Sequence, residues 1–193
     1  MEVRFDLHIV ACARARGLQG VAVCDHDRAL TETWDAPDFL LIPGIELSTD
    51  RGHLLGLFVT EQIEARELDA AIDAVHACGG LAVMAHPFER SSDAQRRAAK
   101  PVTAGSDAHL PEEIGNGVVT LEADALTLPA VRAALLRGAT AVDGRRGKAR
   151  YVAESQLTKR RRTHAGAAAY VKWALFAAKC CLQDITWKGE TYH

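Results

Sequence analysis

The sequence lacks the features that mark secreted and disulfide-bonded proteins. Its five cysteines show no CxxC spacing, and the adjacent pair Cys180 and Cys181 has a poor geometry for a bridge. Charged residues at Glu2, Arg4 and Asp6 interrupt the start, so nothing there resembles a secretory signal. No internal repeat or low-complexity segment is evident. We therefore expect reduced thiols and a cytoplasmic location.

The sequence also has no long apolar run of the kind that predicts a transmembrane helix, which needs about 20 predominantly apolar residues. The nearest candidate, residues 165–182, is rich in Ala but is interrupted by Lys172 and Lys179. The expected structure is an amphipathic helix packed on the rest of the fold. A membrane-surface or oligomer contact is the alternative, because the Trp, Tyr and Lys residues of this segment also suit an interface.

Length and composition are sufficient for one substantial hydrophobic core, since 48% of the 193 residues are hydrophobic and 25% are charged. The charge is distributed unevenly. Residues 144–193 contain 11 Lys or Arg and 3 Asp or Glu, a balance of +8, whereas the balance of residues 1–143 is −10. Basic clusters such as residues 159–162 suit phosphate backbones. An ordinary solvated helix face explains them about equally well.

Four short apolar runs each lead into residues that bind metals. Val21 to Cys24 precedes Asp25, His26 and Asp27; residues 40–42 precede Glu46; residues 81–84 precede His86; and residues 102–104 precede Asp107 and His109. Such runs are typical of strands buried in a parallel α/β sheet, whose carboxyl ends converge at one rim. A single histidine here would more often be a capping or core residue, but the repetition favours a catalytic site for Zn, Mn or Fe.

Helical patterns alternate with these runs. A helix-like stretch at residues 11–17 precedes the first strand. Further helices are expected over residues 64–78, ended by Gly79 and Gly80, and over residues 124–137, ended by Gly138. This alternation predicts β/α units.

Six short runs recur in a recognisable order: Asp6-Leu7-His8, Asp25-His26-Asp27, Gly44-Ile45-Glu46-Leu47-Ser48, Gly52-His53-Leu54-Leu55-Gly56, Ala85-His86-Pro87 and Gly105-Ser106-Asp107-Ala108-His109. In order and approximate spacing they resemble the PHP (polymerase and histidinol phosphatase) family, and most closely its stand-alone nucleotide and oligonucleotide phosphoesterases. The resemblance covers about residues 3–143. It implies a distorted (β/α)7 barrel over residues 1–143, with two or three divalent metal ions. Residues 144–193 would then be a basic, Ala-rich and helical segment packed on the barrel.

The resemblance also implies a set of metal ligands: His8, His26, Glu46, His86, Asp107 and His109. The Glu46 carboxylate would bridge two cations, which lie about 3.5 to 4 Å apart in two-metal sites. His53 is expected to contact the substrate phosphate or to protonate the leaving oxygen. A rim histidine with a structural hydrogen bond is the equally weighted alternative for His53.

Three further residues have expected roles around this site. Arg90 is a candidate for bidentate binding of the substrate phosphate by its guanidinium group. Asp25 and Asp27 are expected to orient His26 rather than to bind metal themselves.

The sequence departs from the family pattern in two places. The first family motif carries a second histidine and a loop with an acidic ligand, whereas His8 leads directly into the helix-like stretch. After Arg90 the family has a further strand with ligands, whereas only residues 91–100 intervene here before the last motif. We therefore expect part of the barrel to be absent. Either this chain omits residues of the real polypeptide, or one metal position loses its ligands.

The leading functional hypothesis is hydrolysis of phosphate esters of nucleotides or short oligonucleotides by a metal-activated water. The resemblance supplies the substrate class, and the pattern of ligands supplies the metal. One alternative is a small-metabolite phosphatase like histidinol phosphatase. Another is a degenerate PHP domain that binds nucleic acid or a partner protein without catalysis, because of the missing first-motif histidine and the basic tail.

Overall fold

The computed structural model describes residues 7–31, 35–36, 38–85, 103–145, 147–164, 166–186 and 191–192. The chain forms two compact units, of which unit 1 comprises residues 1–102 and 121–139 and unit 2 comprises residues 103–120 and 140–193. Each unit contains one sheet, and among the described residues neither sheet closes into a barrel. The complete (β/α)7 barrel is therefore not seen in this part of the chain. The domain boundary expected after residue 143 stays a prediction, because compact units need not be independent domains.

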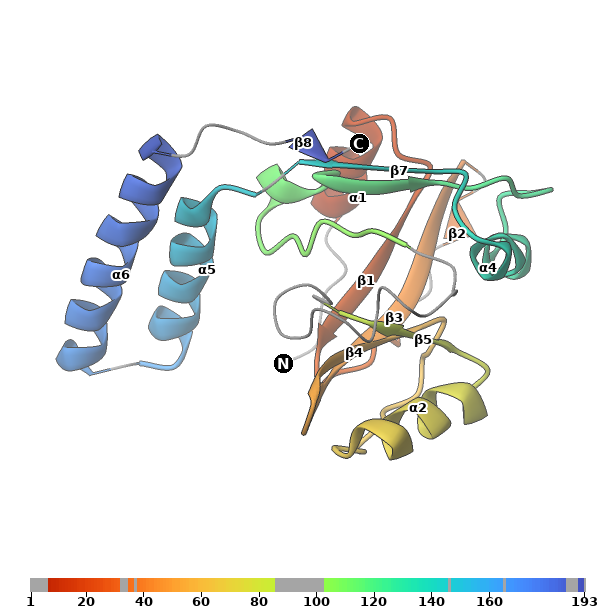
Figure 1. Cartoon of the computed structure of the whole chain (residues 1–193), viewed down its shortest axis with the longest axis horizontal. Coiled ribbons are helices and arrows are strands. Elements are labelled where there is room, and N and C mark those ends of the chain that lie inside the picture. Colours follow the sequence, from red (N-terminus) through yellow and green to blue (C-terminus); the bar gives the residue numbers. More distant parts are fainter. Residues whose placement is uncertain are drawn as a thin grey trace. The chain divides into compact units, whose positions relative to one another are not determined.

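Three strands of the unit 1 sheet run in the same direction (Figure 1). Strand β1 (Gly20–His26) pairs in parallel with β3 (Phe39–Thr49), to which the short β2 (Asp35–Ala36) also pairs. Strand β4 (Gly52–Leu57) is antiparallel to both β3 and β5 (Leu81–Met84). The carboxyl ends of β1, β3 and β5 consequently lie at one edge, as the apolar runs predict. The expectation of a wholly parallel sheet is wrong, because the reversed strand β4 lies between β3 and β5.

The described helices of unit 1 overlap the predicted stretches but have different bounds: the first begins and ends earlier than residues 11–17, and the other two begin later than expected. Helix α1 spans Leu7–Ala15, α2 spans Leu68–Ala77 and α4 spans Leu128–Arg137. The N-cap side chains set both late starts: Glu67 accepts a hydrogen bond from the Ala70 amide, and Thr127 accepts one from the Ala130 amide. Residues 64–66 therefore lie outside the helix and have no regular secondary structure.

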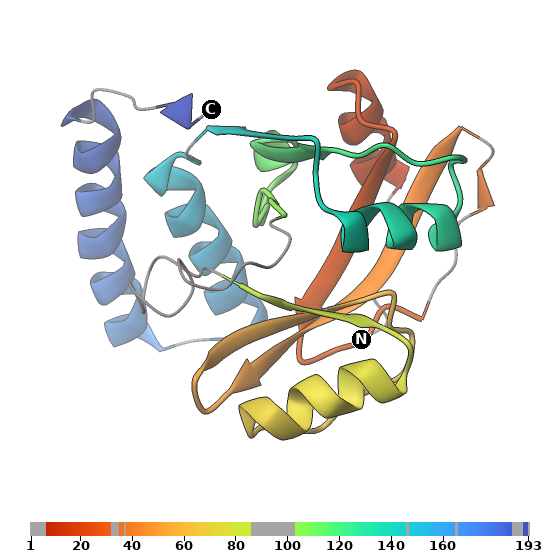
Figure 2. The same cartoon turned by 45° about the vertical axis from the view of Figure 1, so that its right-hand side comes forward.

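The main hydrophobic core lies between the sheet of unit 1 and helix α2, which covers one face of β4 and β5 (Figure 2). Its buried members come from β3, β4, α2 and the segments beside them: Ala29, Ile45, Leu47, Leu54, Val59, Ile63, Ala71 and Val75. Outside this cluster, α1 buries Val10 and Ala13. Helix α4 is tied to the end of α2, because Arg132 donates a hydrogen bond to the Gly79 carbonyl at 3.1 Å.

Unit 2 combines an antiparallel sheet with a pair of helices. Strand β7 (Ala141–Arg145) pairs with β6 (Gly117–Thr120) and with β8 (Thr191–Tyr192), and the short helix η1 (Pro111–Glu113) precedes β6. Helices α5 (Ala149–Arg162) and α6 (Ala167–Thr186) lie side by side in both cartoon views.

Specific polar contacts join α6 to α5. The Trp173 indole donates to the Ala153 carbonyl at 2.7 Å. The Asp184 carboxylate accepts from the Ala149 and Arg150 amides at 2.7 and 3.1 Å, and so caps the first turn of α5. Within unit 2, α6 therefore packs on α5, and the expectation that residues 144–193 pack on a barrel stays a prediction.

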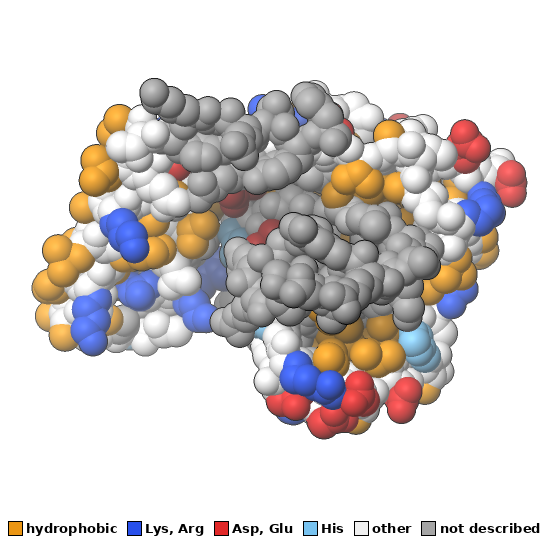
Figure 3. Space-filling model, viewed as in Figure 1, with side chains coloured by type: hydrophobic (Ala, Val, Ile, Leu, Met, Phe, Trp, Pro, Cys, Tyr) orange, Lys and Arg blue, Asp and Glu red, His pale blue; other side chains and the backbone are white. Residues whose placement is uncertain are grey.

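Helix α6 leaves much of its apolar surface in solvent. Its exposed large hydrophobic side chains are Val171, Leu175, Phe176, Leu182 and Ile185. Figure 3 shows hydrophobic and basic side chains together on the surface of the α5 and α6 region, at the left. Within the described ranges, no helix is both long and apolar enough to cross a membrane. The membrane-surface or oligomer contact expected through residues 165–182 stays a prediction.

Candidate metal centre

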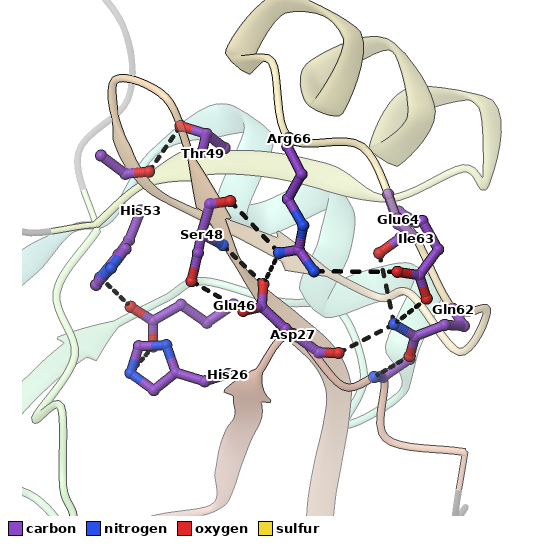
Figure 4. A network of polar contacts seen from close by, with 12 residues as sticks. His26, Asp27, Glu46, Ser48, Thr49, His53, Gln62, Ile63, Glu64 and Arg66 are labelled. Carbon is purple, nitrogen blue, oxygen red and sulfur yellow. Dashed lines mark hydrogen bonds and ion pairs between the residues drawn. The ribbon is translucent and has the colours of Figure 1, made fainter.

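Three side chains on neighbouring strands of unit 1 converge at the edge of the sheet (Figure 4). His26 is the last residue of β1, and it pairs in register with Glu46 of β3. His53, the second residue of β4, pairs in register with Ser48 of β3. Because residues two apart on a strand share a face, the pairing brings His53 to the same side of the sheet as Glu46. One ligand atom from each of His26, Glu46 and His53 lies within 4.8 Å of the other two.

The distances within this group fit a divalent ion. Glu46 Oε2 lies 3.6 Å from His26 Nε2, and Glu46 Oε1 lies 3.0 Å from His53 Nδ1. Two donors, each about 2.1 Å from a tetrahedral zinc ion, are separated by about 3.4 Å. The Glu46 side chain is only 7% exposed, whereas those of His26 and His53 are 51% and 39% exposed. Two imidazoles and one buried carboxylate, open to solvent on the histidine side, are a donor set that suits Zn, Mn or Fe.

His53 joins this group although the sequence did not place it among the metal ligands. Its Nδ1 lies 3.0 Å from Glu46 Oε1, and the two histidine rings meet edge to face, with centroids 5.1 Å apart. The roles expected of His53, which are contact with phosphate, protonation of the leaving oxygen or a structural hydrogen bond, stay predictions. The short link between β3 and β4 indicates an antiparallel pair, but it does not by itself fix which residues of the two strands lie opposite each other.

The last motif, residues 105–109, lies in unit 2. The Ser106 hydroxyl accepts from the Gly117 amide at 3.1 Å, and the buried Glu113 carboxylate accepts from the His109 amide at 3.2 Å. Burial raises the pKa of Glu113 above its ordinary value. Asp107 has a left-handed backbone with φ of 46°, and its carbonyl lies 3.0 Å from His109 Nδ1. These contacts give Asp107 and His109 a defined local conformation within unit 2.

The strand expected to lead into Asp107 is wrong over its described residues. Thr103 and Ala104 have no regular secondary structure, and Val102 lies outside the described residues. The segment is instead held at the start of β6 by the hydrogen bond between the Ser106 hydroxyl and the Gly117 amide. The backbones approach so closely there that a Cβ atom on Gly117 would lie 2.5 Å from the Gly105 carbonyl oxygen.

Of the other expected ligands, His8 is the one that the structure describes in unit 1, and it is not among the three residues of this group. His8 lies in α1, where its Nε2 is 3.6 Å from the Cys12 thiol one turn along the helix. His86 and Arg90 lie outside the described residues. The described chain does reach Ala85, whose amide donates to the His53 carbonyl at 3.1 Å. The roles of His8, His86, Arg90, Asp107 and His109 stay predictions.

Asp27 makes contacts other than those expected of it. Its carboxylate accepts from the amide and the hydroxyl of Ser48, both at 2.9 Å, and forms an ion pair with Arg66. Burial alone would raise the pKa of Asp27, but the hydrogen bonds from Ser48 and Arg66 outweigh it and hold the pKa below its ordinary value. Asp25 is exposed, and its backbone forms a bridge with Arg28. Among the described contacts, neither carboxylate bonds to the His26 ring, and the expectation that Asp25 and Asp27 orient His26 stays a prediction.

Cys24 lies on β1, two residues before His26. Burial, with smaller contributions from the negative charges of Glu46 and Asp25, raises the pKa of Cys24 to about 12. The thiol therefore stays neutral at physiological pH.

We expect iodoacetamide at pH 8.5 to modify exposed Cys181 on the order of 100-fold faster than Cys24 in the metal-free protein, because only the thiolate reacts. Peptide mass spectrometry over time measures both rates. Modification of Cys24 should accelerate as the pH rises towards 12. Equal rates for the two thiols at pH 8.5 would contradict the burial of Cys24.

Comparison with known proteins gives two partial matches. Residues 86–140 match a family described as PHP-associated. Over 69 residues the chain is 42% identical to an uncharacterized protein from Methanocaldococcus jannaschii, covering 35% of this chain and 27% of that protein. The chain thus spans only about a quarter of this relative's length. No solved structure matches the chain. The family match supports a relationship to PHP proteins, and neither match specifies an activity.

Proposed function

We propose that this protein is a metal-dependent phosphoesterase of the PHP type, which hydrolyses phosphate esters of nucleotides or short oligonucleotides. The main support is the convergence of His26, Glu46 and His53, with ligand atoms within 4.8 Å of one another, at the carboxyl end of the sheet. The match of residues 86–140 to a PHP-associated family supports the same assignment independently. The substrate class comes from the resemblance of the six motifs to the stand-alone phosphoesterases.

In this proposal the three residues hold one Mn, Fe or Zn ion. The Glu46 carboxylate would also be able to contact a second ion, because it has two oxygens. His8, His86, Asp107 and His109 would supply ligands for one or two further ions, and Arg90 would bind the substrate phosphate. Ions bound in this way lower the pKa of a water molecule and offset the negative charge that develops on phosphoryl oxygens.

A second candidate is a PHP domain that binds nucleic acid without catalysis. The basic last turn of α5, residues 159–162, favours it, since consecutive Lys and Arg residues suit phosphate backbones. This alternative predicts salt-sensitive binding of nucleic acid without release of phosphate.

A phosphate-release assay tests the proposal. The full chain is loaded with Mn, Fe or Zn and offered a nucleoside bisphosphate, a 5′-phosphorylated oligonucleotide and histidinol phosphate. We expect release from the nucleotide substrates, loss of activity on chelation, and a reduction to near background in His53→Ala. The control His76→Ala changes an exposed histidine of α2 and should retain full activity.

The other outcomes are equally informative. Preference for histidinol phosphate would favour the small-metabolite phosphatase. Salt-sensitive oligonucleotide binding without phosphate release would favour the second candidate. Equal turnover by His53→Ala and the wild-type protein would exclude His53 from the catalytic site.

A further inference from the structure

A polar network connects the extended segment before α2 to the strands that carry the candidate metal ligands (Figure 4). Arg66 forms an ion pair with the Asp27 carboxylate, and its guanidinium also donates to the Ser48 carbonyl at 3.4 Å. The same carboxylate accepts two hydrogen bonds from Ser48. Asp27 thus joins the turn after β1 to strand β3 and to Arg66.

Each candidate ligand is connected to this network, either as a neighbour in the sequence or through the pairing of adjacent strands. Asp27 directly follows His26, and its amide donates to the Glu46 carbonyl at 2.7 Å. Ser48 is two residues beyond Glu46 on β3 and pairs in register with His53. A displacement of Asp27 or Ser48 would therefore move one or more of the ligands.

The turn after β1 needs such support. Asp27 has a φ of 54°, a left-handed conformation that is uncommon for non-glycine residues and that Asp adopts when its short polar side chain is hydrogen-bonded locally. Gln62 contributes on the backbone side, since its amide nitrogen donates to the Asp27 carbonyl at 3.0 Å and its amide oxygen accepts from Ala29 at 3.1 Å. Arg66 is the cation that contacts the Asp27 carboxylate in this network.

We infer that Arg66 is a positioning residue for the metal centre, acting through Asp27 and Ser48 to fix the spacing of His26, Glu46 and His53. The inference rests on the proposed function, because it assumes that these three residues hold a metal ion. Outer partners of metal ligands typically change affinity by about 10- to 100-fold when they are removed. Arg66 acts through one further residue, so the lower end of that range applies.

The test measures the binding of Zn²⁺ to the full chain by competition with a chelating dye, and the visible spectrum of the Co²⁺ form. In Arg66→Ala we expect Zn²⁺ affinity to fall about 10-fold and the Co²⁺ absorption bands to shift. Arg66→Lys should restore part of the affinity, because lysine keeps the charge but cannot bind two acceptors with a planar fork.

The matched control is Arg14→Ala. Arg14 also lies in unit 1 and pairs with a single aspartate, Asp38, through bonds of 2.6 and 2.7 Å. Its side chain is 42% exposed, compared with 50% for Arg66. Loss of either ion pair should affect thermal unfolding of the metal-free protein to a similar extent, but only Arg66→Ala should change metal affinity and the Co²⁺ spectrum.

The outcomes separate this inference from the proposed function. If the wild-type protein binds Zn²⁺, Glu46→Gln abolishes that binding and Arg66→Ala leaves affinity and spectrum unchanged, the positioning role is wrong and the metal centre stands. If the wild-type protein binds none of Zn²⁺, Mn²⁺ and Fe²⁺, both are wrong. Equal loss of affinity in Arg14→Ala would also overturn the positioning role. Should Arg66→Ala fail to fold, Ser48→Ala removes one donor to Asp27 and is expected to lower affinity in the same direction.

Discussion

Glu46→Gln will lower the affinity of the protein for Zn²⁺ or Mn²⁺ by more than about 100-fold. Removing a residue that only supports a metal ligand already lowers metal affinity by about 10- to 100-fold, and Glu46 is proposed as a ligand itself. Glutamine keeps the shape of the side chain but loses its negative charge and one of its two acceptor oxygens. Both oxygens of Glu46 face a histidine, at 3.6 and 3.0 Å, so no equivalent arrangement is available to the amide. Metal titration followed by elemental analysis of the isolated protein measures the loss.

Asp73→Asn is the control for this substitution. It also removes one negative charge from unit 1, but at an exposed position of α2. We expect metal content and affinity to be unchanged in it. Retention of one metal per chain by Glu46→Gln would show that the ion binds elsewhere.

Thermal unfolding distinguishes loss of the site from loss of the fold. Burying an ionised carboxylate is costly, so metal-free Glu46→Gln should unfold at the same temperature as the metal-free wild-type protein, or higher. Metal should then raise the unfolding temperature of the wild-type protein and leave that of the variant unchanged, because a ligand that binds only the folded state stabilises it.

The strands that carry His26 and Glu46 could be predicted from the sequence, whereas the metal-binding roles of the two residues stay predictions. The apolar run before His26 and the one before Glu46 form parallel strands, and the two residues lie side by side in the register of β1 and β3. Even so, Glu46 is not at a strand end, because β3 continues through it to Thr49. An apolar run indicates which part of a strand is buried. It does not indicate how many further residues pair with the neighbouring strand.

The position of His53 was harder to predict, because it depends on a turn. The chain reverses over Asp50 and Arg51, and Thr49 Oγ1 donates to the Gly52 carbonyl at 2.6 Å across the reversal. A shift of one residue in this turn would put His53 on the opposite face of the sheet, away from Glu46. Sequence spacing alone does not fix that register.

The contacts of Arg66 could not be predicted from local patterns at all. Its carboxylate partner Asp27 is 39 residues away in the sequence, and Arg66 lies in a stretch that the hydrophobic pattern assigns to a helix. The N-cap at Glu67 delays the helix, leaves residues 64–66 outside it and so allows Arg66 to reach the turn after β1. A change of a few residues in the start of one helix thus determines whether this network can form.

Gly44→Ala should destabilise the protein by about 1–3 kcal/mol or more, the usual cost of adding atoms to a packed interior. Gly44 is buried in β3 and pairs in register with Cys24 of β1. An added Cβ atom would lie 2.6 Å from the Cys24 thiol and 2.7 Å from the Gly56 carbonyl oxygen. Urea unfolding followed by circular dichroism measures the change in the free energy of unfolding.

The double variant Cys24→Ala/Gly44→Ala separates the two clashes. Removing the Cys24 thiol relieves the first contact, but the Gly56 carbonyl belongs to the backbone and cannot move without disturbing the sheet, so only part of the stability should return. Gly166→Ala, where an added Cβ atom meets nothing within 4 Å, should change stability by less than about 0.5 kcal/mol. Gly44 and Cys24 each precede a candidate ligand by two residues on their strands, so Gly44→Ala should also weaken metal binding by displacing Glu46 relative to His26. A stable Gly44→Ala protein with unchanged metal affinity would mean that β1 and β3 are not packed this closely beneath the site.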